Sequence, residues 1–199
     1  MWVAVMGAPG GAKKEIAEFL GFKKKDHVNF TPDENPFLNH LMFYLNRLVS
    51  QKTIESDRDD SDFVTIGSVW EAVEVYAKVA MQRGDIVKKD YDILWGIYSH
   101  TTFSPPDAIF YSCPPKMTSY NKMMLSGENS IDQEYFDAIV CAYEELTNKV
   151  AMPVVRVERI ENINDLKNDI EFNIASIKSS GVNVGSTIWK KKMFKGAGV

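Results

Sequence analysis

Short apolar runs alternate along the chain with longer stretches whose apolar residues recur every three or four positions. Runs of four or five residues have the length of buried strands, and the longer stretches have the spacing of helices packed on a sheet. The predicted strands cover residues 2–6, 27–30, 63–66, 108–111 and 154–157. The predicted helices cover residues 12–20, 37–51, 69–83, 85–100, 132–150 and 163–179. This alternation predicts an α/β fold with a doubly wound, five-stranded parallel sheet flanked by helices.

The periodic pattern ends near residue 180. Residues 181–186 are rich in glycine and polar residues, which is typical of a flexible linker, and the residues after them are basic and aromatic. We therefore predict a domain over residues 1–180, followed by a linker and a basic, aromatic tail over residues 181–199. Trp189 and Phe194 in this tail suit a protein or nucleic-acid partner, and equally suit packing back onto the sheet.

Composition and charge narrow the function classes. Hydrophobic residues make up 45% and charged residues 25% of the 199 residues, as in an ordinary globular protein. The net charge of −4 argues against nucleic-acid binding over the whole surface but allows a local basic patch. The two cysteines are too few for a disulfide framework, and the apolar runs are too short to cross a membrane. With no signal-peptide pattern at the N-terminus, the cytoplasm is the expected compartment, with no membrane partner.

A glycine-rich segment, residues 7–14, follows the first predicted strand and precedes the first predicted helix. A phosphate-binding loop has the pattern G-x-x-x-x-G-K-[ST], in which backbone N–H groups and the lysine hold phosphates and the hydroxyl binds Mg²⁺. The first glycine and the lysine are in register, but Ala12 replaces the second glycine and Lys14 replaces the hydroxyl residue. The alternative is a glycine-rich turn with solvated lysines. The candidate phosphate-binding residues are Gly7, Gly10, Gly11, Lys13 and Lys14.

Several segments stand in a characteristic order: D-E-N-P-F at 33–37, G-S-V-W-E at 67–71, P-D-A-I-F-Y at 106–111 and P-V-V-R-V at 153–157. The first resembles the E-N-P-Y segment of bacterial deoxyadenosine/deoxyguanosine kinases. The others resemble, in order, their aspartate-arginine segment, their P-D-x-x-I-Y-L strand and their last strand. The resemblance to the deoxynucleoside kinase family spans residues 1–175. It implies a fold that binds a nucleoside and a nucleoside triphosphate.

The residues that this family uses for phosphoryl transfer are replaced. The resemblance puts Phe30 or Thr31 where the family has a glutamate general base, and neither side chain takes up a proton as a carboxylate does. It puts Ile66 and Gly67 where the family has aspartate and arginine, which removes a charge that neutralises phosphate. The lid segment keeps Lys122 and no arginine. Because phosphoryl transfer depends on positioning and charge neutralisation, we expect most of the rate enhancement to be lost.

Some nucleoside-binding features are retained, and packing of helices is the simpler interpretation of each. Asn46 lies near the position of a glutamine that reads the base in the family, although the preceding helix is shorter here. The predicted nucleoside cleft contains Phe30, Thr31, Asn35, Phe37, Asn46, Trp70 and Glu71.

No metal site is expected. The three histidines lack metal-ligand spacing with each other or with the cysteines, and the acidic residues 55–62 lack the glycine and terminal glutamate of a calcium loop. Residues 55–62 are therefore predicted to form a solvated loop, and the lysine run 23–25 to lie on the surface. No cofactor is certain; ATP or a deoxynucleoside triphosphate is expected to bind weakly and without Mg²⁺.

Three functions fit these observations. The first is a deoxynucleoside-kinase-fold protein without phosphoryl transfer, acting as a nucleotide-binding or protein-interaction subunit. The second is an active deoxynucleoside or deoxynucleoside-monophosphate kinase with a rebuilt site, using Lys13, Lys14 and Lys122. The third is a scaffold in a nucleoprotein assembly that docks through residues 187–199. Helix 69–83 has an apolar arc wider than one buried face requires, which predicts a homodimer or heterodimer through this helix.

Overall fold

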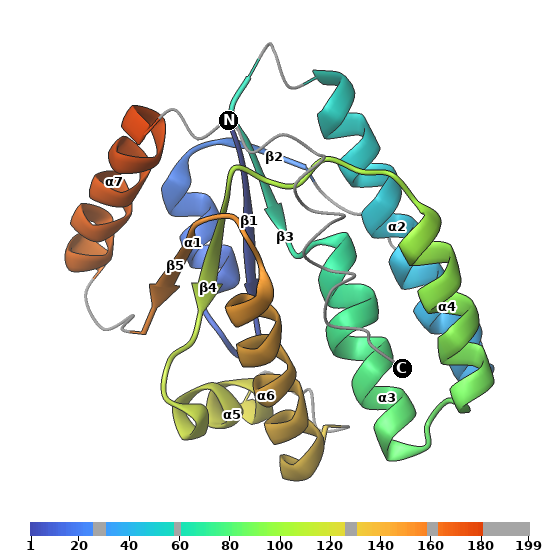
Figure 1. Cartoon of the computed structure of the whole chain (residues 1–199). Helices are drawn as coiled ribbons and strands as arrows, with labels where there is room; N and C mark the ends of the chain where they lie inside the picture. The colour runs from blue at the N-terminus through green and yellow to red at the C-terminus, as the bar shows by residue number, and fades with distance from the viewer. Residues whose placement is uncertain (26–30, 58–60, 126–130, 159–162, 181–199) are drawn as a thin grey trace.

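A five-stranded parallel sheet with strand order β2-β3-β1-β4-β5 forms the centre of the molecule (Figure 1). The computed structural model describes residues 1–25, 31–57, 61–125, 131–158 and 163–180. The strands are β1 (Trp2–Gly7), β2 (Lys23–Lys24), β3 (Phe63–Ile66), β4 (Ala108–Ser112) and β5 (Val154–Val157). The helices are α1 (Lys13–Leu20), α2 (Pro36–Asp57), the π-helix η1 (Glu71–Ala77), α3 (Lys78–Arg83), α4 (Lys88–His100), α5 (Lys116–Leu125), α6 (Gln133–Lys149) and α7 (Ile163–Ser180). The predicted α/β class and parallel sheet are confirmed.

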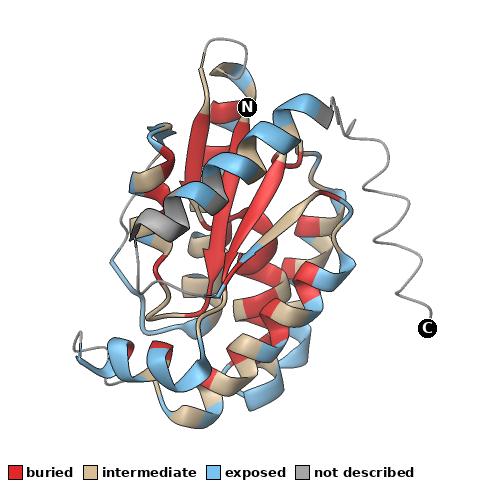
Figure 2. Cartoon of the chain, turned by 90° about the vertical axis from the view of Figure 1, so that its left-hand side faces the viewer, coloured by how far each residue is buried: buried red, intermediate tan, exposed pale blue. Residues whose placement is uncertain are grey.

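Both faces of the sheet are covered, so the central strand β1 is apolar throughout. Val3 and Val5 pack with α1 and α7 on one face, whereas Ala4 and Met6 pack with η1 and α6 on the other. Figure 2 shows the resulting band of buried residues through the centre of the molecule. A parallel sheet buried on both sides produces the continuous apolar run that the sequence displays.

The second strand lies earlier in the chain than the apolar pattern predicts. β2 consists of two exposed lysines, Lys23 and Lys24, whereas the predicted strand 27–30 falls in residues 26–30, outside the described residues. Lys23 donates its backbone N–H to Asp62 O at 3.0 Å, and Lys25 donates to Val64 O at 3.1 Å. An edge strand pairs through backbone groups alone, and charged side chains there protect the edge from further pairing.

Helix α2 is longer than predicted and includes the first residues of the acidic segment. It continues to Asp57, so the loop predicted over 55–62 begins later. An i,i+3 ion pair between Lys52 and Glu55 (2.7 Å) lies within this last part of the helix. Such pairing of opposite charges stabilises the last turns of α2. The apolar pattern ends before these turns and therefore did not predict them.

The helix predicted over 69–83 is a central element, and its apolar side chains are buried within the single chain. Trp70, Val73 and Ala77 are fully buried within the single chain, between α2 and α4 on one side and α6 on the other (Figure 1). Its wide apolar arc therefore reflects contact with several helices of the same chain. The apolar arc therefore no longer argues for a dimer, and a homodimer or heterodimer through helix 69–83 stays a prediction.

Two further predictions concern membrane spans and the C-terminal tail. No helix in the described ranges is long and apolar enough to cross a bilayer. The linker and tail, residues 181–199, lie outside the described residues, so the domain boundary at residue 180 and the role of the tail remain predictions.

Candidate functional site

The glycine loop, residues 7–14, joins the carboxyl end of β1 to the start of α1, as in a phosphate-binding loop. In this structure the loop bonds to itself. Lys13 Nζ donates to Gly7 O at 2.6 Å and to Ala8 O at 3.0 Å, and the N–H of Gly11 donates to Ala8 O at 3.2 Å. A bound phosphate would compete with these internal bonds for Lys13 and Gly11.

Helix α5, the segment that resembles the kinase lid, is packed directly on the glycine loop. Gly10 has φ +72°, and a Cβ there would overlap the carbonyl oxygen of Ser119 on α5. Lys122 Nζ lies 2.6 Å from Glu15 Oε1, which ties α5 to α1 across the loop. Lys122 is thus engaged with Glu15, and α5 covers the glycine loop.

Only part of the predicted strand end falls within the described residues. Thr31 is exposed, and Phe30 lies outside the described residues. Lys14, at the position of the Mg²⁺-binding hydroxyl, is also exposed. Among the described residues, no group of three or more histidine, cysteine, aspartate or glutamate side chains gathers closely enough to hold a metal ion.

A shallow, open pocket of about 370 Å³ lies between α2 and η1; we call it the α2 pocket. The rings of Phe43 and Tyr76 meet edge to face with centroids 5.4 Å apart, and the Arg47 guanidinium lies 4.7 Å from the Phe43 ring centroid. Aromatic walls with a few polar groups are typical of small-molecule sites. The pocket is lined by Asn39, His40, Phe43, Arg47 and Tyr76.

A buried polar network supports the α2 pocket. Arg47 NH1 donates to Ile66 O at 2.6 Å, at the carboxyl end of β3, and Arg47 NH2 lies 3.3 Å from Glu71 Oε1. Tyr143 donates its hydroxyl to Glu71 Oε2 at 2.9 Å, and its oxygen lies 3.4 Å from that of Tyr76. The Arg47 charge is therefore balanced by Glu71 inside the protein.

Gly67 is required by this network. Its φ is +93°, and an added Cβ would overlap Glu71 Oε1 and lie 2.8 Å from Arg47 Cζ. The Arg47–Glu71 pair thus occupies the space beside position 67. The Arg47 guanidinium from α2 thus lies beside Gly67, the position at which the family resemblance expects an arginine.

Burial decides the protonation of the pocket's titratable groups. It lowers the pKa of the His40 imidazole, against a smaller opposing effect of Asp85. Burial is also the main cause that raises the pKa of the Tyr76 hydroxyl well above its usual value, with Glu71 adding to the shift. The pocket therefore presents a neutral imidazole, a protonated hydroxyl and a balanced guanidinium, which suits a neutral polar ligand.

The predicted cleft residues are only partly brought together. Asn35 Oδ1 accepts from Phe37 N at 3.0 Å at the start of α2, and the Phe37 ring packs on a small core cluster. Asn46 is absent from the α2 pocket lining, and Trp70 is fully buried against Phe103. Of the predicted set, Glu71 supports the pocket through Arg47.

The sequence interpretation missed the residues that line the α2 pocket. His40, Phe43 and Arg47 follow one another at spacings of three and four, and therefore share a face of α2. This stripe of a polar, an aromatic and a basic residue on the helix after the second strand could have indicated the pocket from the sequence. Tyr76 had no such signal, because its place depends on the π-helical turn of η1.

Comparisons with known proteins agree with this architecture, although no protein-family model matches the chain. The deoxyadenosine/deoxycytidine kinase of Bacillus subtilis (strain 168) is 27% identical over 205 residues, covering 89% of this chain and 91% of that protein. The deoxyadenosine kinase of M. mycoides with bound dATP superposes with a TM-score of 0.67 at 18% identity, covering 88% of this chain and 100% of that chain. The structure of the same kinase with the product dCMP and a flexible dCDP also gives a TM-score of 0.67, at 19% identity and with 90% and 100% coverage. Together with the glycine loop and the sheet order, these similarities show that the chain has the deoxynucleoside kinase family fold.

Proposed function

We propose that this protein binds a deoxynucleoside in the α2 pocket and has lost efficient phosphoryl transfer. The observation that carries the proposal is an aromatic pocket whose Arg47 reaches the carboxyl end of β3, in a chain whose glycine loop lacks the expected transfer groups. Phe43, Tyr76 and His40 offer aromatic and neutral polar contacts to a base. At the loop, Lys14 stands where a Mg²⁺-binding hydroxyl is needed, and Gly67 stands in place of a charged side chain.

The ligand class follows from the chemistry of the pocket and the names of the relatives. A cavity of about 370 Å³ is within the range of small-ligand sites and suits one nucleoside. The relatives are kinases of deoxyadenosine and deoxycytidine, which makes these two deoxynucleosides the first ligands to test. Any nucleoside triphosphate at the glycine loop is expected to bind weakly and independently of Mg²⁺.

An active kinase is the second candidate, favoured by the names of these relatives. In that case Lys13, Lys14 and Lys122 would neutralise phosphate after α5 moves away from the loop. Kinases of this chemistry turn over at about 1–100 s⁻¹. Activity in that range is therefore the measurable difference between the two candidates.

The test combines binding and turnover on the same full-length preparation. We expect calorimetry to detect binding of deoxyadenosine or deoxycytidine to the protein. Phe43→Ala should abolish that binding. Phe172→Ala, on the opposite side of the sheet, is the control and should retain it. We expect no product from deoxynucleosides or their monophosphates with Mg-ATP, with the Bacillus subtilis kinase as positive control. Turnover of about 1 s⁻¹ would establish the second candidate. Absence of deoxynucleoside binding would refute the first.

A second partner surface, besides helix 69–83, is proposed on the outer face of α2 and α4. Leu38, Met42, Leu45 and Val49 form an exposed stripe on α2 with spacings of four, three and four. Such spacing is that of a helix–helix seam, and a two-fold axis lets one stripe pack on its copy. The proposed occupant is a second copy of this chain.

The free cysteines Cys113 and Cys141 suit a reducing compartment, and we propose the cytoplasm.

A further inference from the structure

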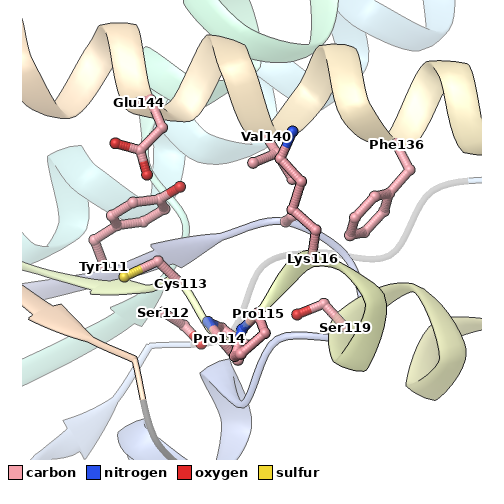
Figure 3. A pocket seen from close by; sticks show the side chains of 11 residues that line it. Tyr111, Ser112, Cys113, Pro114, Pro115, Lys116, Ser119, Phe136, Val140 and Glu144 are labelled. Atoms are coloured by element: carbon pink, nitrogen blue, oxygen red, sulfur yellow. The ribbon is translucent and has the colours of Figure 1, made fainter.

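A second cavity, of about 270 Å³, lies between the end of β4, the first turn of α5, and α6; we call it the α5–α6 pocket (Figure 3). Its walls include the side chains of Tyr111, Phe136 and Val140, and it borders Ala8 of the glycine loop. It shares no lining residue with the α2 pocket. Its volume lies just below the range of drug-sized sites, so it suits one small ring system.

The hydroxyl of a mostly buried serine, Ser119, points into this cavity. Ser119 is 3% exposed, and its hydroxyl makes no hydrogen bond within the described parts of the chain. Figure 3 shows its oxygen directed toward the pocket. Because this hydroxyl faces the pocket and has no protein partner among the described residues, it is available to a donor or acceptor on a bound molecule.

A second hydroxyl lies on the floor of the same cavity. Ser112 is 2% exposed, and its Oγ accepts from the backbone N–H of Ala12 at 3.1 Å. Its own proton is donated to no acceptor among the described residues. Ser112 and Ser119 therefore present two O–H donors, which favours a ligand with acceptor atoms such as ring nitrogen or carbonyl oxygen.

The charged groups around the cavity are already neutralised. Glu144 accepts from Arg156 NH1 at 3.1 Å and NH2 at 2.8 Å, and this hydrogen bonding holds the pKa of Glu144 below its usual value. Lys116 at the rim lies 3.5 Å from Asp137 Oδ1. Because its charges are balanced, its walls apolar and its donors neutral, the cavity suits a neutral molecule better than an ion.

We propose that the α5–α6 pocket binds a neutral, planar heteroaromatic ring of nucleobase size, whose acceptor atoms take hydrogen bonds from Ser112 and Ser119. The apolar walls bury the faces and edges of the ring, and the two hydroxyls orient it. This site is separate from the α2 pocket and does not depend on the function proposed for it.

Cys113 gives a direct readout, because its side chain lines the pocket whereas that of Cys141, on α6, is exposed. The full-length protein is treated with iodoacetamide at mildly alkaline pH, and both alkylation rates are followed by mass spectrometry. Purine at ten times its dissociation constant should slow the Cys113 reaction by about tenfold and leave Cys141 unchanged. Indole, a flat ring without an acceptor nitrogen, should protect far less. Equal protection by indole, or none by purine up to its solubility, would overturn the proposal.

Two variants locate the binding. Ser119→Ala should weaken purine protection by about tenfold without lowering the melting temperature, because the hydroxyl has no partner to lose. Met117→Ala, on the exposed side of α5, is the matched control and should retain protection. A Ser119→Ala protein that melts earlier yet keeps its purine affinity would assign the hydroxyl a structural role and refute the site.

The α2 pocket is tested in parallel to keep the two proposals distinct. Phe43→Ala should abolish deoxynucleoside binding and leave purine protection of Cys113 intact. Protection lost in Phe43→Ala would place purine in the α2 pocket and overturn this inference. Protection without deoxynucleoside binding in the unmodified chain would instead refute only the proposed function.

Discussion

At the scale of single residues, the Arg47–Glu71 pair links helix α2, the end of β3 and the start of η1. Arg47 is 12% and Glu71 3% exposed at the side chain, so both charges are largely removed from water. Each is stabilised mainly by the other and by neighbouring oxygens of Ile66 and Tyr143. Removing one partner would leave a buried charge uncompensated.

We therefore expect Arg47→Met to lower the free energy of unfolding by about 3 kcal/mol in urea denaturation. The double variant Arg47→Met, Glu71→Gln should recover much of that loss, because it buries no unpaired charge. Arg83→Met, which breaks an exposed pair with Asp132, is the control and should change stability little. A double variant as unstable as the single one would show that the charges are not coupled.

His40 makes stability depend on pH. Its pKa is lowered in the folded protein by burial, so the unfolded chain takes up the proton first as pH falls below about 6.5. Stability should therefore fall with acidification from that pH, and His40→Gln should flatten this part of the profile. His100→Gln, at an exposed position, is the comparison. Melting curves over a pH series test this, and an unchanged slope in His40→Gln would contradict it.

At the scale of elements, the π-helix η1 arranges the support of the α2 pocket. Glu71 and Tyr76 are five residues apart, about 140° around an ordinary α-helix but on a similar face of a π-helix. Both reach the hydroxyl of Tyr143 on α6 as a result. The wider turn thus joins η1 to α6 by a polar contact inside an apolar layer.

Helix α5 is held on the glycine loop partly by the exposed ion pair between Lys122 and Glu15. Lys122→Met should loosen α5 and raise the affinity for ATP, because triphosphate binding requires access to the loop. Exposed pairs contribute at most about 1 kcal/mol, so the gain in calorimetry should not exceed about fivefold. Lys88→Met breaks an exposed pair on α4 and should have no effect. Weaker ATP binding by Lys122→Met would assign the lysine to phosphate contact instead.

The exposed stripe of α2 predicts self-association. Leu45 and Val49 are 39% and 58% exposed. Their joint replacement by aspartate should convert a dimer to a monomer in light scattering at micromolar concentration, since desolvating two carboxylates at an apolar seam is unfavourable. Phe172→Asp, at an exposed site on α7, should leave the mass unchanged. A monomeric unmodified chain would refute the second copy as occupant.

At the scale of the whole molecule, the tail beyond residue 180 is the remaining test of the scaffold alternative. Trp189→Ala with Phe194→Ala should remove association with a partner recovered on the native protein and leave the melting temperature unchanged. A loss of several degrees instead would mean that the two aromatic residues pack on the domain. Purification with native partners attached, followed by thermal melts of both proteins, separates the two outcomes.

The apolar periodicity of the chain predicted the alternation of strands and helices and the parallel sheet. It did so because burial on both faces requires apolar strands, as in β1 and β4. Motif spacing placed the glycine loop, and the family resemblance predicted which catalytic residues are replaced. The edge strand β2 was missed, because its lysines pair by backbone groups that carry no side-chain pattern.

The amino-acid sequence alone thus determined the class of fold and the position of the loop, because these depend on local pattern and residue chemistry, whereas the replacement of transfer groups stays a prediction. Tertiary structure decided which side chains meet. Arg47 reaches the end of β3 from a distant helix, Tyr76 enters the α2 pocket through a π-helical turn, and Ser119 closes over Gly10. Such contacts depend on how helices pack across the sheet, and sequence spacing within one element carries no information about that packing.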